Sequence, residues 1–142
     1  MNNLRFLIAF AFAGLLAAPL VSSAADNHTK GAEPVHVLGG QELKLEDYLV
    51  PGKTTVFDFH SEYCPPCRAI GPRVEKLHQT RGDIAVVEID INRPDVKGID
   101  WQSPVARQYV LESIPHFKIF GPDGKLQAEG DPAYEQILNW IK

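Results

Sequence analysis

The sequence is poor in cysteine: its 142 residues contain only Cys64 and Cys67. Because a second cysteine pair is absent, the four-thiolate zinc sites built from two such pairs are disfavoured. Basic residues are also in deficit, with 14 lysines and arginines against 18 aspartates and glutamates. This balance argues against nucleic acid or an anionic membrane surface as a partner. The chain has no internal repeat, no low-complexity segment and no sign of a second domain.

The sequence also lacks an apolar run long enough to span a bilayer. Residues 6–21 form a run of 16 residues interrupted by Gly14 and Pro19, whereas a span needs roughly 18 to 20. Small residues follow, so the pattern predicts a secretory signal peptide over residues 1–24, cleaved after Ala24 or Ala25. An uncleaved membrane anchor is the alternative.

Export implies a periplasmic or otherwise extracytoplasmic protein with a flexible leader over residues 26–34 and one domain over residues 35–142. Paired cysteines in an oxidising compartment usually form structural disulfides. A bridge that closes a two-residue loop, however, constrains the unfolded chain little. The pair Cys64 and Cys67 is therefore better explained by chemistry than by stability.

Apolar periodicity predicts an alternation of strands and helices. Strand, helix and strand in succession form a parallel crossover, and the turn at residues 121–124 predicts an antiparallel hairpin. We therefore expect an α/β domain with a central mixed β-sheet flanked by helices. The predicted strands are residues 35–38, 54–60, 84–91, 116–120 and 125–129, and the predicted helices are residues 43–49, 64–79, 103–111 and a closing helix after Asp131-Pro132.

The Cys-x-x-Cys pair stands at the start of the predicted helix over residues 64–79. A helix N-terminus offers unpaired N–H groups and partial positive charge, which lower the pKa of the first thiol. Cys64 is then the attacking thiolate, and Cys67 resolves the mixed disulfide. A passive small-loop disulfide and half of a metal site remain the alternatives.

The residues around this pair resemble the thioredoxin family. The similarity includes the strand with Asp58, the active-site turn, Pro72 in the following helix, and Ser113-Ile114-Pro115 before a strand. The resemblance covers roughly residues 35–142. It implies a thioredoxin-like fold, thiol-disulfide exchange with protein substrates, a membrane or soluble thiol electron donor, no organic cofactor and a monomer.

The resemblance also implies roles for individual residues. Pro115 should be cis and lie against the cysteine pair, and Asp58 should help to move the proton of Cys67. The expected substrate contacts are Tyr63, Pro66, Ile114, Pro115 and His116. In this chain Glu88 occupies the strand position where thioredoxins often have a lysine. We hypothesise that Asp58 and Glu88 are neighbours and that their repulsion keeps one of them protonated; the alternative is that Asp58 is a half-exposed strand residue.

Pro65 and Pro66 bear on the direction of electron flow. They have no amide hydrogen, so two donors that would stabilise the Cys64 thiolate are missing. A less stabilised thiolate lowers the reduction potential, which favours a reductase over an oxidase or isomerase.

The histidines offer another reading. A non-catalytic copper or zinc module is the alternative from another functional class. It would use Cys64, Cys67 and His116, with His60 as a further candidate ligand. The remaining histidines, His28, His36 and His78, look like surface residues. Residues 94–103, which include Trp101, form an insertion relative to a compact thioredoxin and are expected either to pack beside the active site or to cover the core.

Overall fold

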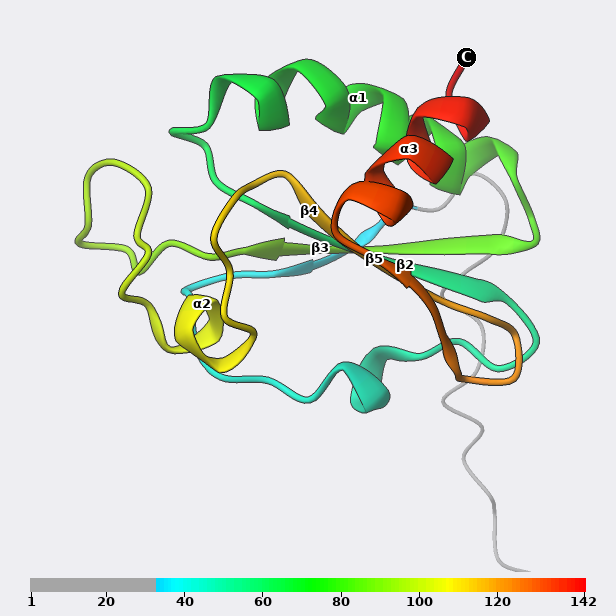
Figure 1. The fold of residues 1–142 in the computed structure, drawn as a ribbon, viewed down its shortest axis with the longest axis horizontal. Coiled ribbons are helices and arrows are strands. Elements are labelled where there is room, and N and C mark those ends of the chain that lie inside the picture. The colour runs from blue at the N-terminus through cyan, green and yellow to red at the C-terminus, as the bar shows by residue number, and fades with distance from the viewer. Residues whose placement is uncertain (1–32) are drawn as a thin grey trace, which may run out of the picture.

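The chain folds into a five-stranded sheet with helices on both faces (Figure 1). The computed structural model describes residues 33–142, so the expected signal peptide and most of the leader lie outside the described residues. The elements in chain order are β1 (Val35–Val37), a 3-10 helix η1 (Leu45–Tyr48), β2 (Thr54–His60), α1 (Pro65–Thr80), β3 (Ile84–Asp90), α2 (Pro104–Gln108), β4 (His116–Phe120), β5 (Leu126–Glu129) and α3 (Asp131–Trp140). None of the helices within residues 33–142 is both long and apolar enough to cross a membrane.

The sheet is mixed, as expected. Its strand order is β1-β3-β2-β4-β5, in which β1, β3 and β2 run parallel and β4 and β5 are antiparallel to their neighbours. Since β2 and β3 are parallel, their carboxyl ends meet at one edge of the sheet. The turn that carries the two cysteines follows β2 at this edge, beside the loop that leaves β3 (Figure 1).

Successive residues of each strand point to opposite faces of the sheet, and each face has its own core. On one face Val56 and Val86 pack under α1 and α3, with Phe117 from β4. On the other face Phe57 and Val87 pack with residues of η1 and α2. Asp58 and Glu88 continue the first series, so they lie on the face covered by α1.

The helix α2 is shorter than the predicted range of residues 103–111. Ser103 caps its start, as the sequence suggests, and accepts a hydrogen bond from the Ala106 N–H at 3.2 Å. The helix ends in a Schellman arrangement, in which the N–H groups of Val110 and Leu111 donate to the carbonyl oxygens of Arg107 and Ala106. Val110 takes the left-handed conformation that this cap requires, with φ of 50°.

Replacing Val110 by glycine should stabilise the protein. A left-handed backbone costs a residue with a Cβ roughly 1 to 2 kcal/mol, and the Val110 side chain, 75% exposed, has little burial to lose. We expect Val110→Gly to raise the free energy of unfolding by about 1 kcal/mol in urea titrations, after the greater freedom of glycine in the unfolded chain is subtracted. Val110→Ala is the matched control, because alanine keeps the penalty. Equal stability of the glycine and alanine variants would contradict the prediction.

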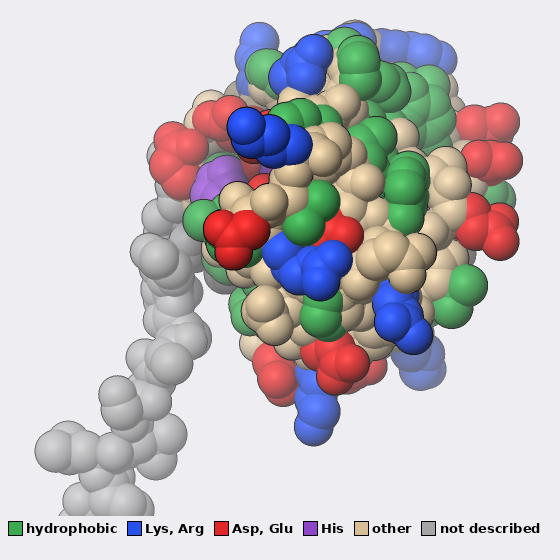
Figure 2. All heavy atoms as spheres, turned by 90° about the vertical axis from the view of Figure 1, so that its left-hand side faces the viewer, with side chains coloured by type: hydrophobic (Ala, Val, Ile, Leu, Met, Phe, Trp, Pro, Cys, Tyr) green, Lys and Arg blue, Asp and Glu red, His purple; other side chains and the backbone are tan. Residues whose placement is uncertain are grey.

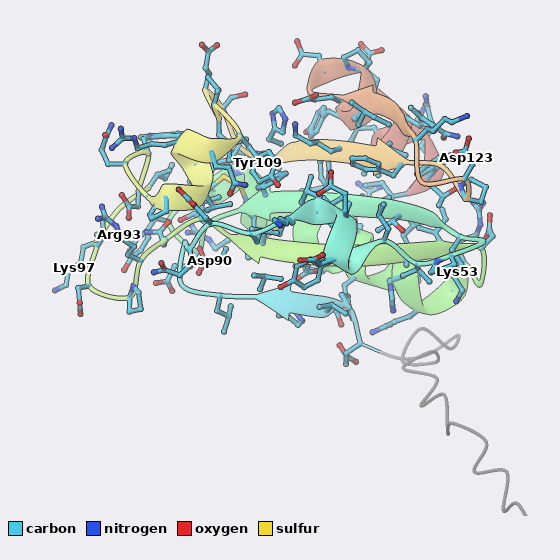
Figure 3. The ribbon with its side chains drawn as sticks, turned by 90° about the horizontal axis from the view of Figure 1, so that it is seen from below. Lys53, Asp90, Arg93, Lys97, Tyr109 and Asp123 are labelled. Carbon is cyan, nitrogen blue, oxygen red and sulfur yellow. A yellow bond between two sulfur atoms is a disulfide. The ribbon has the colours of Figure 1, made fainter. Side chains whose placement is uncertain are left out.

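The expected insertion is an ordered loop closed by its own polar contacts. Arg93 makes two hydrogen bonds to the carboxylate of Asp100, at 2.7 and 3.0 Å, and the Asn92 amide donates to the carbonyl of Gly98. Figure 3 shows Arg93 and Lys97 at the same end of the sheet as Asp90. Ile99 of this loop packs against the core, whereas Trp101 is 37% exposed and is not among the residues packed against either core.

One histidine prediction is wrong. His78 is buried at 3% exposure, and its Nδ1 accepts a hydrogen bond from the Val86 N–H at 2.9 Å. Because it lies on the inward face of α1 and binds a strand, its role is structural. His28 lies outside the described residues.

Candidate functional site

The cysteine pair lies where β2 ends and α1 begins. Cys64 is the N-cap residue of α1 and is joined to Cys67 in a disulfide, with the two Cα atoms 5.2 Å apart. Pro65 and Pro66 are the first two helical residues and bring no N–H groups. The Cys67 N–H is therefore the donor from the first helical turn that reaches Cys64 Sγ, at 3.2 Å. The helix N-terminus favours a thiolate at Cys64. Because of the two prolines, fewer backbone N–H groups can donate hydrogen bonds to that thiolate than in a turn without proline.

The peptide bond between Ile114 and Pro115 is cis, as the family resemblance implies. The carbonyl oxygen of Ile114 lies 3.6 Å from Cys64 Sγ, so this segment covers the sulfur from the side of β4. Cys64 and Cys67 are only 1% and 5% exposed. Access to either sulfur in the oxidised protein therefore requires a shift of the covering segments.

Asp58 is a buried carboxyl group on the α1 face of β2. It is 3% exposed, and its Oδ1 has no hydrogen-bond partner among residues 33–142. Burial, together with the charge of Glu88, raises the pKa of Asp58 to about 8. The predicted buried position of Asp58 is confirmed and the alternative of a half-exposed strand residue is wrong, so the carboxyl group can exchange protons near neutral pH.

Glu88 lies directly beside Asp58, since the two residues are register partners in the parallel pair of β2 and β3. This placement confirms that they are neighbours across two strands. Burial also raises the pKa of Glu88, and His36 opposes the shift from the other side, with Nδ1 3.1 Å from Glu88 Oε2. The carboxyl pair therefore favours binding one proton, held by Asp58.

A cavity of about 250 Å³ joins this carboxyl pair to Cys67. Its lining comes from the end of β2, the first half of α1 and the end of β3, and includes Asp58, His60, Cys67, Arg68, Glu75, Glu88 and Asp90. Sequence reasoning missed Arg68, Glu75 and Asp90. Helical spacing from Cys67 and the alternation of β3 place them on this side, but neither pattern marks them as functional.

The substrate-facing residues surround the cysteines. Tyr63 is 38% exposed next to Cys64, and Pro66 is exposed on the first turn of α1. His116 follows the cis bond, with its Nε2 3.5 Å from Glu129 Oε1. Burial lowers the pKa of His116, although Glu129 partly offsets this effect. The ring is therefore mostly neutral at pH 7.

The residues that the sequence assigned to the site come from β2 and the turn after it, the start of α1, β3, and the segment that leads into β4. Within residues 33–142, no group of three or more histidine, cysteine, aspartate or glutamate side chains has a geometry that would hold a metal ion. The surface at this end of the molecule mixes lysine and arginine with aspartate and glutamate (Figure 2). Such mixing offers no broad field of one sign to a charged polymer.

Comparison with known proteins shows the family from the sequence and the fold from solved structures. The family model described as Thioredoxin matches residues 40–142. The chain is 31% identical over 85 residues to a thioredoxin of Mycoplasmoides gallisepticum, which covers 60% of this chain and 76% of that protein. It is 25% identical over 117 residues to chloroplastic thioredoxin F2 of Arabidopsis thaliana, covering 78% of this chain and 60% of that longer protein. Among solved structures, a thioredoxin variant from Halobacterium salinarum NRC-1 superposes with a TM-score of 0.54 at 24% identity, over 80% of this chain and 95% of that one.

Proposed function

The chain belongs to the thioredoxin family of thiol-disulfide oxidoreductases, and from this premise we propose that it reduces disulfides of protein clients outside the cytoplasm. Thiol-disulfide exchange through Cys64 and Cys67 follows from the family and the disulfide. The direction of exchange rests on the single observation that Pro65 and Pro66 remove two donors from the helix start at Cys64. The location rests on the signal-like pattern of residues 1–24.

The proposed cycle begins with attack of the Cys64 thiolate on a client disulfide. One client sulfur binds Cys64, and the other leaves as a thiolate that takes up a proton from water. The ionised form of Asp58, which a pKa of about 8 leaves as a minor species at neutral pH, takes the proton of Cys67. Cys67 then attacks Cys64 Sγ, so that the Cys64–Cys67 disulfide forms and the second client sulfur leaves. Two electrons pass from the protein dithiol to the client, and a partner dithiol returns them.

Client binding is assigned to the exposed rim of the site. The cis bond at Pro115 turns the backbone of Ile114 toward Cys64, where an extended client segment can pair with it as an added strand. Tyr63 and Pro66 offer apolar contact beside the reactive sulfur, and His116 borders the other side.

The reduction potential tests the proposed direction. We expect a value below about −200 mV, in the range of reducing members of this superfamily. The measurement is equilibration of the purified protein against glutathione redox buffers, with the oxidised fraction read by thiol alkylation. A potential near about −120 mV, which is typical of a strong oxidase, would overturn the reductase assignment. Replacing Pro65-Pro66 by Gly-Ala restores two donors and should raise the potential.

Fractionation tests the proposed location independently. A carboxyl-terminally tagged full-length chain expressed in a Gram-negative host should appear in the periplasmic fraction, shortened by residues 1–24. The same chain with Leu15→Arg and Leu16→Arg should stay in the cytoplasm, because charges interrupt the apolar run. Retention of the unaltered chain in the cytoplasm at full length would rule out export.

A further inference from the structure

His36, Glu88 and Asp58 form one row across three neighbouring strands. His36 in β1 and Asp58 in β2 are both register partners of Glu88 in the strand between them, β3. The row is joined at one side by the contact of His36 Nδ1 with Glu88 Oε2 at 3.1 Å. Since register partners in a sheet point to the same face, all three side chains lie on one face of the sheet. The helix α1 lies over this face (Figure 1).

Exposure falls steadily along this row. The side chain of His36 is 49% exposed and that of Glu88 is 13% exposed, whereas Asp58 is 3% exposed. Beyond Asp58 the next strand presents Phe117, which is fully buried and apolar. The polar side of Asp58 therefore opens toward Glu88 and the cavity, and the row leads from the cavity to solvent.

Glu88 is the central member of the row and is faced by charged groups from several elements. His36 approaches from β1, Asp58 from β2 and Glu75 from α1, and Glu33 precedes β1. His36 is the cation of this set when it is protonated. The three carboxyl groups disfavour a negative charge at Glu88, so they help Glu88 to take up a proton. The contact with His36 acts in the opposite direction and favours release of that proton on the solvent side. The imidazole of His36 is a base and is in contact with water.

We propose that His36 is the solvent-side member of a proton relay that serves the cysteine pair: the proton that Asp58 accepts from Cys67 passes to Glu88 and from there to His36 and water. The proposal rests on the role given above to Asp58. One proton moves and no electron does, and water within the cavity can bridge Asp58 and Glu88. His36 touches neither sulfur, so it is a positioning residue that acts through Glu88.

A second exit from the cavity is available at its other end. His60 and Asp90 also line the cavity, and His60 Nε2 is buried without a hydrogen-bond partner among the described residues. Burial lowers the pKa of His60, and no ion pair to a carboxylate is formed by this histidine in the described part of the chain. The contact with Glu88 is what favours His36 as the exit, and His60→Gln distinguishes the two routes.

Single-turnover reduction of a chromogenic aromatic disulfide by the reduced protein tests the relay. Attack by Cys64 releases the first coloured thiolate, and resolution by Cys67 releases the second, so the two steps appear as separate phases. We expect His36→Ala to leave the first phase unchanged and to slow the second at least about tenfold at low buffer concentration. Added imidazole should restore the second phase, because it can occupy the space left by the ring and carry the proton.

Three variants complete the test. His36→Gln keeps a hydrogen-bonding side chain beside Glu88 but cannot carry the proton, so its second phase should be slow and should not respond to imidazole. Lys125→Gln removes a cation beside Asp123, which lies at the opposite end of the sheet from Asp90 (Figure 3), and both phases should match those of the unaltered protein. His60→Gln should slow the second phase less than His36→Ala does.

The possible outcomes distinguish a failure of the proposed relay from a failure of the proposed thiol-disulfide exchange. A normal second phase in His36→Ala, or a slow phase that imidazole leaves slow, overturns the relay, as does a greater effect of His60→Gln. If Asp58→Asn also leaves the second phase unchanged, the proton role of Asp58 fails with it. Failure of the unaltered protein to produce either phase would instead contradict thiol-disulfide exchange itself.

Discussion

Replacing Cys64 by serine is expected to abolish disulfide reduction, with turnover falling at least about a thousandfold. The serine hydroxyl stays protonated at neutral pH and cannot replace the thiolate at the helix N-cap. Replacing Cys67 by serine has a different result. Cys64 still attacks, but nothing resolves the adduct, so the protein accumulates as a stable mixed disulfide with its client. Insulin reduction measures the first effect, and mass spectrometry of the trapped adduct measures the second.

The expected loss of turnover in Cys64→Ser does not arise from a loss of stability when the disulfide is removed. The bridge closes a short loop, for which the entropy model gives about 2 kcal/mol of stabilisation. Cys64→Ser should therefore unfold at the same urea concentration as the reduced unaltered protein, which remains active. Residual turnover above one per cent in a folded Cys64→Ser variant would exclude Cys64 as the nucleophile, and trapping through Cys67 would reverse the two assignments.

Replacing Asp58 by asparagine is expected to have two effects. It should make the oxidised protein more stable, and it should slow the resolution of the mixed disulfide by Cys67. The pKa of Asp58 is raised from 3.8 to about 8 in the folded protein, so the folded state binds more protons than the unfolded state between these values. The stability of the unaltered protein must then fall as pH rises from about 4 to 8. Asparagine fills the same space without ionising, so the variant lacks this loss. At pH 8 the advantage is on the order of 5 kcal/mol.

Urea titrations of the oxidised protein at several pH values measure this effect. The difference between Asp58→Asn and the unaltered protein should be small near pH 4 and grow up to pH 8. The raised pKa of Glu88 adds a slope of the same sign in both proteins, so the difference between them reports Asp58 together with its coupling to Glu88. The rate of resolution by Cys67 should fall at least about tenfold in the variant. Parallel pH profiles of stability in the two proteins would refute the burial of an ionisable group at this position.

Much of the site was visible in the sequence because its signals are local. Cys64 and Cys67 are separated by two residues at a helix start, and Ile114-Pro115 stands directly before a strand, so each feature is contained in a short segment. Asp58 stood out because a charged residue interrupts a strand that is otherwise buried. The resemblance to thioredoxins, which often have a lysine at the matching strand position, placed Glu88 beside it, and the sheet register confirms that the two are neighbours.

His36 escaped sequence reasoning because its importance depends on a long-range pairing. It is the middle residue of the three-residue strand β1, and only the pairing of β1 with β3 brings it to Glu88. The sequence around His36 does not predict the register in which β1 pairs with β3. The left-handed conformation of Val110 was missed because the sequence signal for it is glycine or asparagine, and valine is neither. The Schellman hydrogen bonds hold Val110 in this conformation against its local preference.

The start of α3 shows a similar conflict. Asp131-Pro132 has the composition of a cap followed by the first helical residue, but Asp131 is itself helical and Gly130 is the cap. Gly130 has φ of 63°, which glycine adopts without strain, and its carbonyl accepts from the Tyr134 N–H at 2.9 Å. At this boundary the glycine, rather than the aspartate, therefore marks the N-cap of the helix.

The near-complete burial of Cys64 affects how fast different thiols can reduce the disulfide, rather than how tightly they bind. With 1% and 5% exposure, neither sulfur of the oxidised pair stands open to collision. A small free thiol brings too little contact area to move the segment around Ile114, whereas a protein partner that docks across Tyr63 can spend binding energy on that shift. We therefore expect small thiols to reduce the oxidised pair slowly, and a docking protein partner to reduce it faster.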